Sequence, residues 1–129
     1  MPHYAVGKTV ALPFDTAVAR ITEELAKVGF GILTEIDVQA TMKKKLDLTM
    51  PPYRILGACN PQYASKALAL EPQIGALLPC NVVVRQDDAG RVHVEFMDPH
   101  SVLGLVNRSE IEPIAGEVRQ RLEQALAAL

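Results

Sequence analysis

The side chains best suited to chemistry in this chain are two cysteines, each placed next to an asparagine and a proline. Cys59 stands before Asn60 and a proline, and Cys80 stands between a proline and Asn81. Cys59 ends one apolar, strand-like run, and Cys80 begins another. If these strands are antiparallel neighbours, the end of the first lies beside the start of the second. The sequence therefore predicts that both thiols and both amides gather at one rim of a sheet.

Two further candidate ligand-binding residues begin the strand that leads to Cys59. They are Tyr53 and Arg54, and the alternation of a strand points Arg54 to the face opposite Tyr53 and Cys59. A charged side chain on a central strand needs a carboxylate partner or an anionic ligand. Glu35 or Asp37 would be the structural partner, and both interpretations of Arg54 stay open.

Three roles are open for the cysteines: small buried residues, a redox pair, or ligands of a soft metal. Free cysteine is among the most buried residue types, and a reactive thiol must be accessible and have a low pKa. The chain has no Cys-x-x-Cys motif, and His3, His93 and His100 lack the spacing of zinc ligands, so structural zinc is not expected. Two thiolates, or a cysteine with Met97, would suit a softer metal, and a histidine could ligate haem. The sequence therefore leaves both metal and cofactor unknown.

Composition limits the class of protein. The 129 residues, 49% of them hydrophobic and 22% charged, are typical of one globular domain, which we expect to span residues 1–129. A net charge of -2 gives no reason to expect binding to nucleic acid or to an anionic membrane. The first residues lack the pattern of a secretory signal, and no apolar run reaches the length of a membrane span. With reduced thiols, these features favour the cytoplasm.

Hydrophobic periodicity predicts an α+β fold: a two-layer sandwich of a mostly antiparallel sheet and two long amphipathic helices. Alternating residues indicate an edge strand first and a hairpin around residues 87–90. Asn and Asp before proline predict two of the helix starts, and Ser109 with Glu112 forms a capping-box pattern before the last helix. We expect strands at 3–12, 30–38, 53–59, 80–86 and 91–97, and helices at 13–28, 38–46, 61 to about 71, 73–78, 99–106 and 110–129.

The second strand carries a specific expectation about its two faces. Strict alternation places Ile32, Thr34 and Ile36 on one face and Glu35 and Asp37 on the other. A carboxylate pair can serve acid–base catalysis only in a cleft that shifts a pKa. Three lysines follow closely, so the sequence favours a solvated face with loose ion pairs.

Three segments of the chain resemble the signature segments of domain-of-unknown-function family 302. They are GILTEIDV at 31–38, PYRILGACNP at 52–61 and LPCNVVV at 78–84, and the likeness extends over essentially the whole chain. The resemblance implies a fold similar to that of the TATA-box-binding protein, and it implies no catalytic residue because none is established for the family. Nucleic-acid binding does not follow from a shared fold, and the chain has no basic face to support it.

The sequence leaves three hypotheses about function. The first is a non-catalytic cytoplasmic protein, a homodimer, that binds a small molecule or cofactor near Cys59, Asn60, Cys80 and Asn81. The second is a thiol-dependent protein that senses redox state or binds a soft metal or haem. The third is a structural or interaction dimer without a ligand. No residue is proposed as catalytic.

Overall fold

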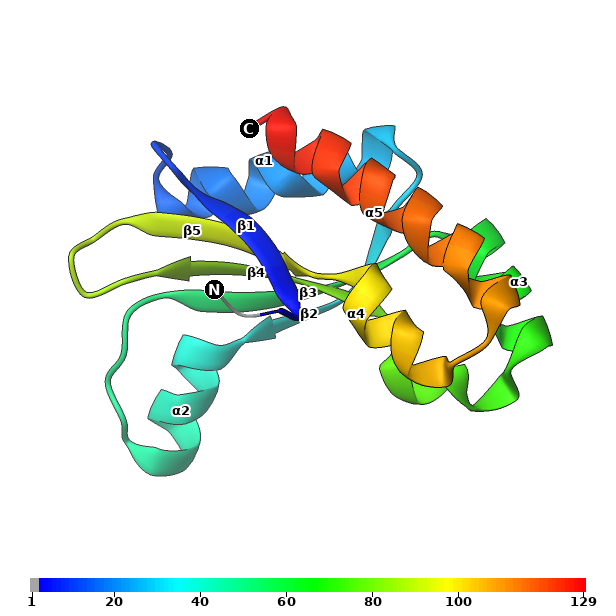
Figure 1. Ribbon diagram of the computed structural model, residues 1–129. Helices are drawn as coiled ribbons and strands as arrows, with labels where there is room; N and C mark the ends of the chain where they lie inside the picture. Colours follow the sequence, from blue (N-terminus) through cyan, green and yellow to red (C-terminus); the bar gives the residue numbers. More distant parts are fainter. Residues whose placement is uncertain (1–2) are drawn as a thin grey trace.

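Five strands form one antiparallel sheet in the spatial order β1-β5-β4-β3-β2. The computed structural model describes residues 3–129. Met1 and Pro2, which belong to the segment in which no secretory signal was expected, lie outside the described residues. β1 and β2 are the edge strands and β4 is central (Figure 1). In chain order the strands are β1 (Ala5–Val10), β2 (Gly31–Asp37), β3 (Tyr53–Cys59), β4 (Cys80–Gln86) and β5 (Val92–Met97).

Helices cover one face of this sheet and one of its ends. Figure 1 shows α1 (Phe14–Lys27) and α5 (Glu112–Ala127) above the sheet and α2 (Val38–Leu46) below it. The shorter helices are α3 (Pro61–Leu70), α4 (Pro99–Leu103) and the 3₁₀ helices η1 (Pro72–Leu77), η2 (Gly104–Val106) and η3 (Ser109–Ile111). No helix within residues 3–129 is both long enough and apolar enough to cross a lipid bilayer.

Three helices begin at a side chain that caps them. Oδ1 of Asp37 accepts the backbone N–H of Ala40 at 2.9 Å, and Oδ1 of Asp98 accepts that of His100 at 3.0 Å. Asn60 caps α3 in the same way. Each cap satisfies an N–H group that has no partner inside the first turn of the helix. The predicted starts at Asn60 and Asp98 are therefore confirmed.

The core lies between the sheet and the two long helices. Alternation along β4 and β5 sends every second side chain towards α1 and α5, which each present an apolar stripe. The buried side chains that meet here are Val82, Val84, Val94, Phe96, Ile21, Leu25, Val118 and Leu122. The expected α+β sandwich is confirmed, whereas the likeness to the TATA-box-binding protein stays a prediction.

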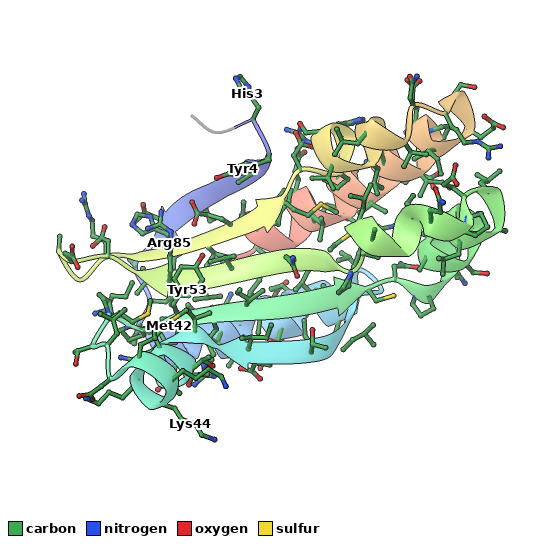
Figure 2. All side chains as sticks on the ribbon, turned by 90° about the horizontal axis from the view of Figure 1, so that it is seen from below. His3, Tyr4, Met42, Lys44, Tyr53 and Arg85 are labelled. Atoms are coloured by element: carbon green, nitrogen blue, oxygen red, sulfur yellow. The ribbon has the colours of Figure 1, made fainter. Side chains whose placement is uncertain are left out.

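The opposite face of the sheet is only partly covered. Ile55, Val83 and Glu95 are cross-strand neighbours on this face, and all three are half-buried. Figure 2, which views the molecule from this side, shows Tyr53 and Arg85 together near α2. The Arg85 guanidinium is paired with the Glu95 carboxylate, with 2.7 Å between Nε and Oε1. Polar and apolar side chains are thus mixed on an accessible surface.

The prediction that β2 alternates strictly is wrong. Ile32 and Thr34 pair with consecutive residues of β3, so Leu33 is an extra residue in a β-bulge. The bulge reverses the faces of the residues that follow it. Ile36 therefore points away from α1 and α5, and Glu35 lies on the same side of the sheet as the core. Periodicity in the sequence has no sign of the inserted residue.

The capping box expected at Ser109 and Glu112 does not form. The Ser109 hydroxyl donates to Oε1 of Glu110 at 3.4 Å, and no side chain caps α5. The 3₁₀ helix η3 instead runs directly into α5. Because Ile111 already has helical backbone angles, the chain does not pass through the extended conformation that a capping residue adopts.

We predict that Gly57→Ala destabilises the protein by about 1–3 kcal/mol, the usual cost of overpacking. A methyl group on Gly57 would overlap the Thr34 hydroxyl and lie 2.9 Å from Cγ of Pro79, inside the packed junction of β2, β3 and β4. The free energy of unfolding in urea measures the effect. Gly31→Ala is the matched control, because its methyl group would meet no heavy atom within 4 Å. Equal stability of the two variants would contradict this account of the junction.

Candidate functional site

A cleft opens at the end of the sheet where β3 ends and β4 begins. Its volume is about 300 Å³, and α3, η1, α4 and α5 enclose it together with the ends of the two strands. Phe30, Leu103 and Val118 are buried residues that line it. Leu33 and Leu68 also line it but are 66% and 42% exposed, so the cleft is open to solvent on their side.

The walls of the cleft are almost entirely apolar. Of the residues between 3 and 129 that line it, none is an Asp, Glu, Lys, Arg or His. Among the described residues that line it, those with polar side-chain groups are Asn60, Tyr63, Cys59 and Cys80. Ligand sites combine such apolar walls with a few polar groups that orient the ligand. The cleft could therefore hold an apolar molecule and is poorly suited to a multiply charged one.

Asn60 is the buried polar residue of this site. It is 8% exposed, and its Oδ1 accepts the backbone N–H groups of Gln62 at 3.1 Å and Tyr63 at 3.4 Å. Because the oxygen is used by these donors, the remaining amide nitrogen, Nδ2, points elsewhere. It lies next to Gly29, where a Cβ atom would come within 2.9 Å of it. Nδ2 has no hydrogen-bond acceptor among the described residues.

The structure brings both cysteines to the same end of neighbouring strands. Ala58 of β3 pairs with Cys80 of β4, and Cys59 is the next residue along β3. Both thiol residues line the cleft, and both are free. Alternation along β3 nevertheless sends the side chains of Cys59 and Ala58 to opposite faces, so Cys59 and Cys80 leave the sheet on different sides. This arrangement does not favour a disulfide between them.

The environment of Cys80 makes its thiol unreactive. Burial, and to a lesser degree the neighbouring Cys59 sulfur, raise the pKa of the Cys80 thiol to about 12. The thiolate is the nucleophile and the metal-binding form of cysteine. At neutral pH Cys80 is therefore a protonated, buried wall residue, which matches the structural role considered from the sequence. Cys59 is only half-buried and is the more accessible thiol.

The predicted site residues Tyr53, Arg54 and Asn81 do not line the cleft. Tyr53 begins β3 and lies at the other end of the sheet, near α2 (Figure 2). Asn81 is exposed on the partly covered face, opposite Gly57. Asn81 thus lies at the same end of the sheet as Cys59, as expected, but outside the cleft. Tyr53 and Arg54 were included in the site because they belong to the strand that leads to Cys59. A strand of this length, at about 3.3 Å per residue, separates its two ends by roughly 20 Å.

Of the two interpretations left open for Arg54, the structure shows the ion pair with carboxylates of β2. Its Nη1 lies 2.7 Å from Oε1 of Glu35, and its Nε lies 3.6 Å from Oδ2 of Asp37. The guanidinium also lies 5.9 Å from the centre of the Phe14 ring. The two carboxylates considered as a catalytic pair, those of Glu35 and Asp37, are thus both engaged by one arginine. Alternation on β3 and the bulge in β2 together produce this ion-pair cluster.

Metal-binding roles gain no support from the side chains in the described part of the chain. Across residues 3–129 there is no group of three or more His, Cys, Asp or Glu residues that could hold a metal ion. His93 hydrogen-bonds the Asp87 carboxylate at 2.8 Å and the Thr9 hydroxyl at 3.1 Å, far along the hairpin from the cleft. The hydrogen bond from His93 is the main cause of a lowered pKa of the Asp87 carboxyl.

Sequence reasoning missed several residues that form the cleft. Phe30, Tyr63 and Leu103 come from separate segments, and each looks like an ordinary core residue in the sequence. On α5 a usable signal was present: Ile114 and Val118 are four residues apart and share one helical face. Which of these apolar faces would meet around an open space depends on the packing of distant segments, and the sequence does not contain that information in a local pattern.

We predict that one thiol of the folded protein reacts quickly with dithiobis(nitrobenzoate) at neutral pH and that the second thiol reacts only in denaturant. Cys59 is half-buried, whereas Cys80 is buried and its pKa is raised to about 12. Absorbance of the released thionitrobenzoate gives the number of reactive thiols. Cys59→Ser should abolish the fast reaction, and Cys80→Ser should leave it unchanged. Fast reaction of Cys80 in the folded protein would restore the thiol-dependent hypothesis.

Comparison with known proteins identifies relatives without a known activity. The model of the family "Domain of unknown function DUF302" matches residues 6–129. An uncharacterized protein of Aquifex aeolicus (strain VF5) is 33% identical over 69 residues, a match that covers 53% of this chain and only 46% of that relative. The crystal structure of an uncharacterized conserved DUF302 protein from Bacillus stearothermophilus is 28% identical, with a TM-score of 0.90 and 98% of each chain covered.

Proposed function

The chain belongs to the DUF302 family, and from the site described above we propose that it binds a small apolar molecule without catalysing a reaction on it. The observation that carries the proposal is the apolar cleft of about 300 Å³ between α3, α5 and the ends of β3 and β4. Cys59, Asn60 and Cys80 contribute to its walls. No catalytic residue is part of the proposal.

The size of the cleft supports a ligand of about two rings. Ligand pockets in proteins usually measure roughly 300–1,000 Å³, so this cleft is at the small end of the range. An apolar cavity of about 150 Å³ holds one benzene molecule. A cleft twice as large would take a bicyclic molecule or a chain of comparable volume. A nucleotide or another large polar cofactor would not match either its size or its walls.

The thiol-dependent alternative has less support. A redox pair requires sulfurs that can approach each other and at least one thiol that ionises readily. Cys59 and Cys80 leave the sheet on opposite faces, and burial keeps Cys80 protonated at neutral pH. Haem or soft-metal binding would need further ligands near these sulfurs. The cleft wall offers none besides the thiols themselves in the described part of the chain.

The proposal includes a cytoplasmic location and a homodimer, both first expected from the sequence. Binding to nucleic acid or to a membrane is not part of it, because a net charge of -2 supplies no electrostatic attraction to either. The partly covered sheet face is the surface on which we place the dimer. Half-buried Ile55 and Val83 give it an apolar centre, and the Arg85–Glu95 pair lies beside them.

We predict that Ala64→Leu abolishes the binding of naphthol, a neutral two-ring probe that suits the volume of the cleft. Ala64 lines the cleft, and leucine there would fill part of its volume while remaining compatible with the α3 helix. Isothermal titration calorimetry or naphthol fluorescence measures saturable binding. Ala69→Leu is the matched control, because Ala69 is an exposed residue of the same helix outside the cleft. Naphthol binding that is absent from the wild type, or equal in both variants, would refute the proposed site.

We predict that the chain sediments as a dimer and that Val83→Lys shifts it to a monomer. A lysine at this position would place a charge in the centre of the partly covered face, and desolvating that charge would oppose association. Analytical ultracentrifugation measures the mass. Leu105→Lys is the control, because Leu105 is 74% exposed and lies in η2, outside the sheet. A wild-type monomer at every concentration, or a Val83→Lys dimer, would refute this interface.

A further inference from the structure

A positively charged group lies at the edge of the apolar cleft. Ile114 and Val118 form the α5 part of the wall, and Arg121 follows Val118 by three residues, so it lies one helical turn further along the same side. The Arg121 Nε donates to the Tyr63 hydroxyl at 3.0 Å, and its guanidinium lies 5.4 Å from the centre of the Tyr63 ring. Arg121 itself does not line the cleft, but it is hydrogen-bonded to Tyr63, which does.

The charge of Arg121 is not neutralised by any carboxylate in residues 3–129. Its side chain forms no ion pair there, and besides Tyr63 it donates only to the Val28 carbonyl, at 3.1 Å from Nη1. A guanidinium has five N–H donors, and these two hydrogen bonds leave most of the outer ones unused. Arg54, by contrast, is held between two carboxylates.

A second unused donor lies close to the first. Nδ2 of Asn60 finds no acceptor among the described side chains or backbone groups, and it is accessible to solvent, because no fully buried side-chain nitrogen or oxygen in residues 3–129 lacks a partner. Both side chains lie next to Gly29: a Cβ atom there would be 2.9 Å from Asn60 Nδ2 and 3.8 Å from Arg121 Nη1, the nitrogen that also donates to the Val28 carbonyl. The glycine thus permits the Asn60 amide and the Arg121 guanidinium to pack close to the same backbone position, which brings the two side chains near each other.

From this geometry we infer that the ligand of the cleft is a monocarboxylate with an apolar body of about two rings, its carboxylate bound by Arg121 and Asn60. The inference depends on the proposed function, since it concerns the same cleft. A planar carboxylate has two oxygens, which match a guanidinium and an amide donor. The apolar walls contact the rest of the molecule, so one end of the site is charged and the other end is apolar.

The test compares naphthol with the naphthoate whose carboxylate occupies the ring position of the naphthol hydroxyl. We expect the wild-type protein to bind naphthoate about tenfold more tightly, the size of effect expected for a hydrogen-bonded charge. Arg121→Gln should remove this preference while leaving naphthol binding unchanged. Arg20→Gln is the matched control, because Arg20 also donates to a backbone carbonyl, that of Ala128, and forms no ion pair in residues 3–129.

Asn60→Asp provides a second variant that should keep the fold. Aspartate caps a helix as well as asparagine does, so α3 should form normally, and an unchanged melting temperature would verify this. The variant replaces the free amide donor by a carboxylate that repels naphthoate and pairs with Arg121. We expect naphthoate binding to weaken more than naphthol binding, because only naphthoate carries the charge that the new carboxylate repels.

The outcomes separate this inference from the proposed function. If both probes bind equally and Arg121→Gln changes neither, while Ala64→Leu still abolishes binding, the carboxylate site is refuted and the apolar cleft remains. If Ala64→Leu has no effect on either probe, both proposals fail. A preference for naphthoate that is lost in Arg121→Gln and in Asn60→Asp, but kept in Arg20→Gln, supports the inference.

Discussion

The position of the cleft depends on the hydrogen bonds that Asn60 makes to the start of α3. Because its Oδ1 accepts from the backbone of Gln62 and Tyr63, the chain changes from strand to helix within one residue of Cys59. This direct junction places a helix against the end of the sheet instead of over its face. The helix and the 3₁₀ segment that follows it then form one side of the cleft, and α5 forms the other.

Local signals in the sequence predict most of this architecture. The stripe of α1, the hairpin of β4 and β5, and the caps at Asn60 and Asp98 all depend on residues a few positions apart, so a pattern can reveal them. The bulge at Leu33 depends on pairing with β3, and the walls of the cleft come from segments spread between Phe30 and Val118. The sequence placed the two cysteines at one rim because Cys59 ends β3 and Cys80 begins its antiparallel neighbour β4, whereas Tyr53 and Arg54 begin β3 and lie at the other end of the sheet.

The chemistry of the site follows from where charges are paired and where they are not. At the α2 end of the sheet Arg54 is matched by the carboxylates of β2, and Arg85 is matched by Glu95. At the other end the cleft is apolar, its buried thiol stays protonated, and Arg121 has no acidic partner in residues 3–129. Ion pairs thus satisfy the charges at one end of the sheet, and free donors remain at the end where we propose that a ligand binds.

The bulge at Leu33 also bears on how the molecule behaves at high concentration. An edge strand with a regular, unbroken row of backbone groups is a template on which another chain can add a strand, and repeated addition produces fibres. In β2 the extra residue interrupts that row in the middle of the edge, and at the opposite edge Lys8 places a charge within β1. The bulge at Leu33, which hydrophobic periodicity does not predict, therefore helps to limit the sheet to five strands.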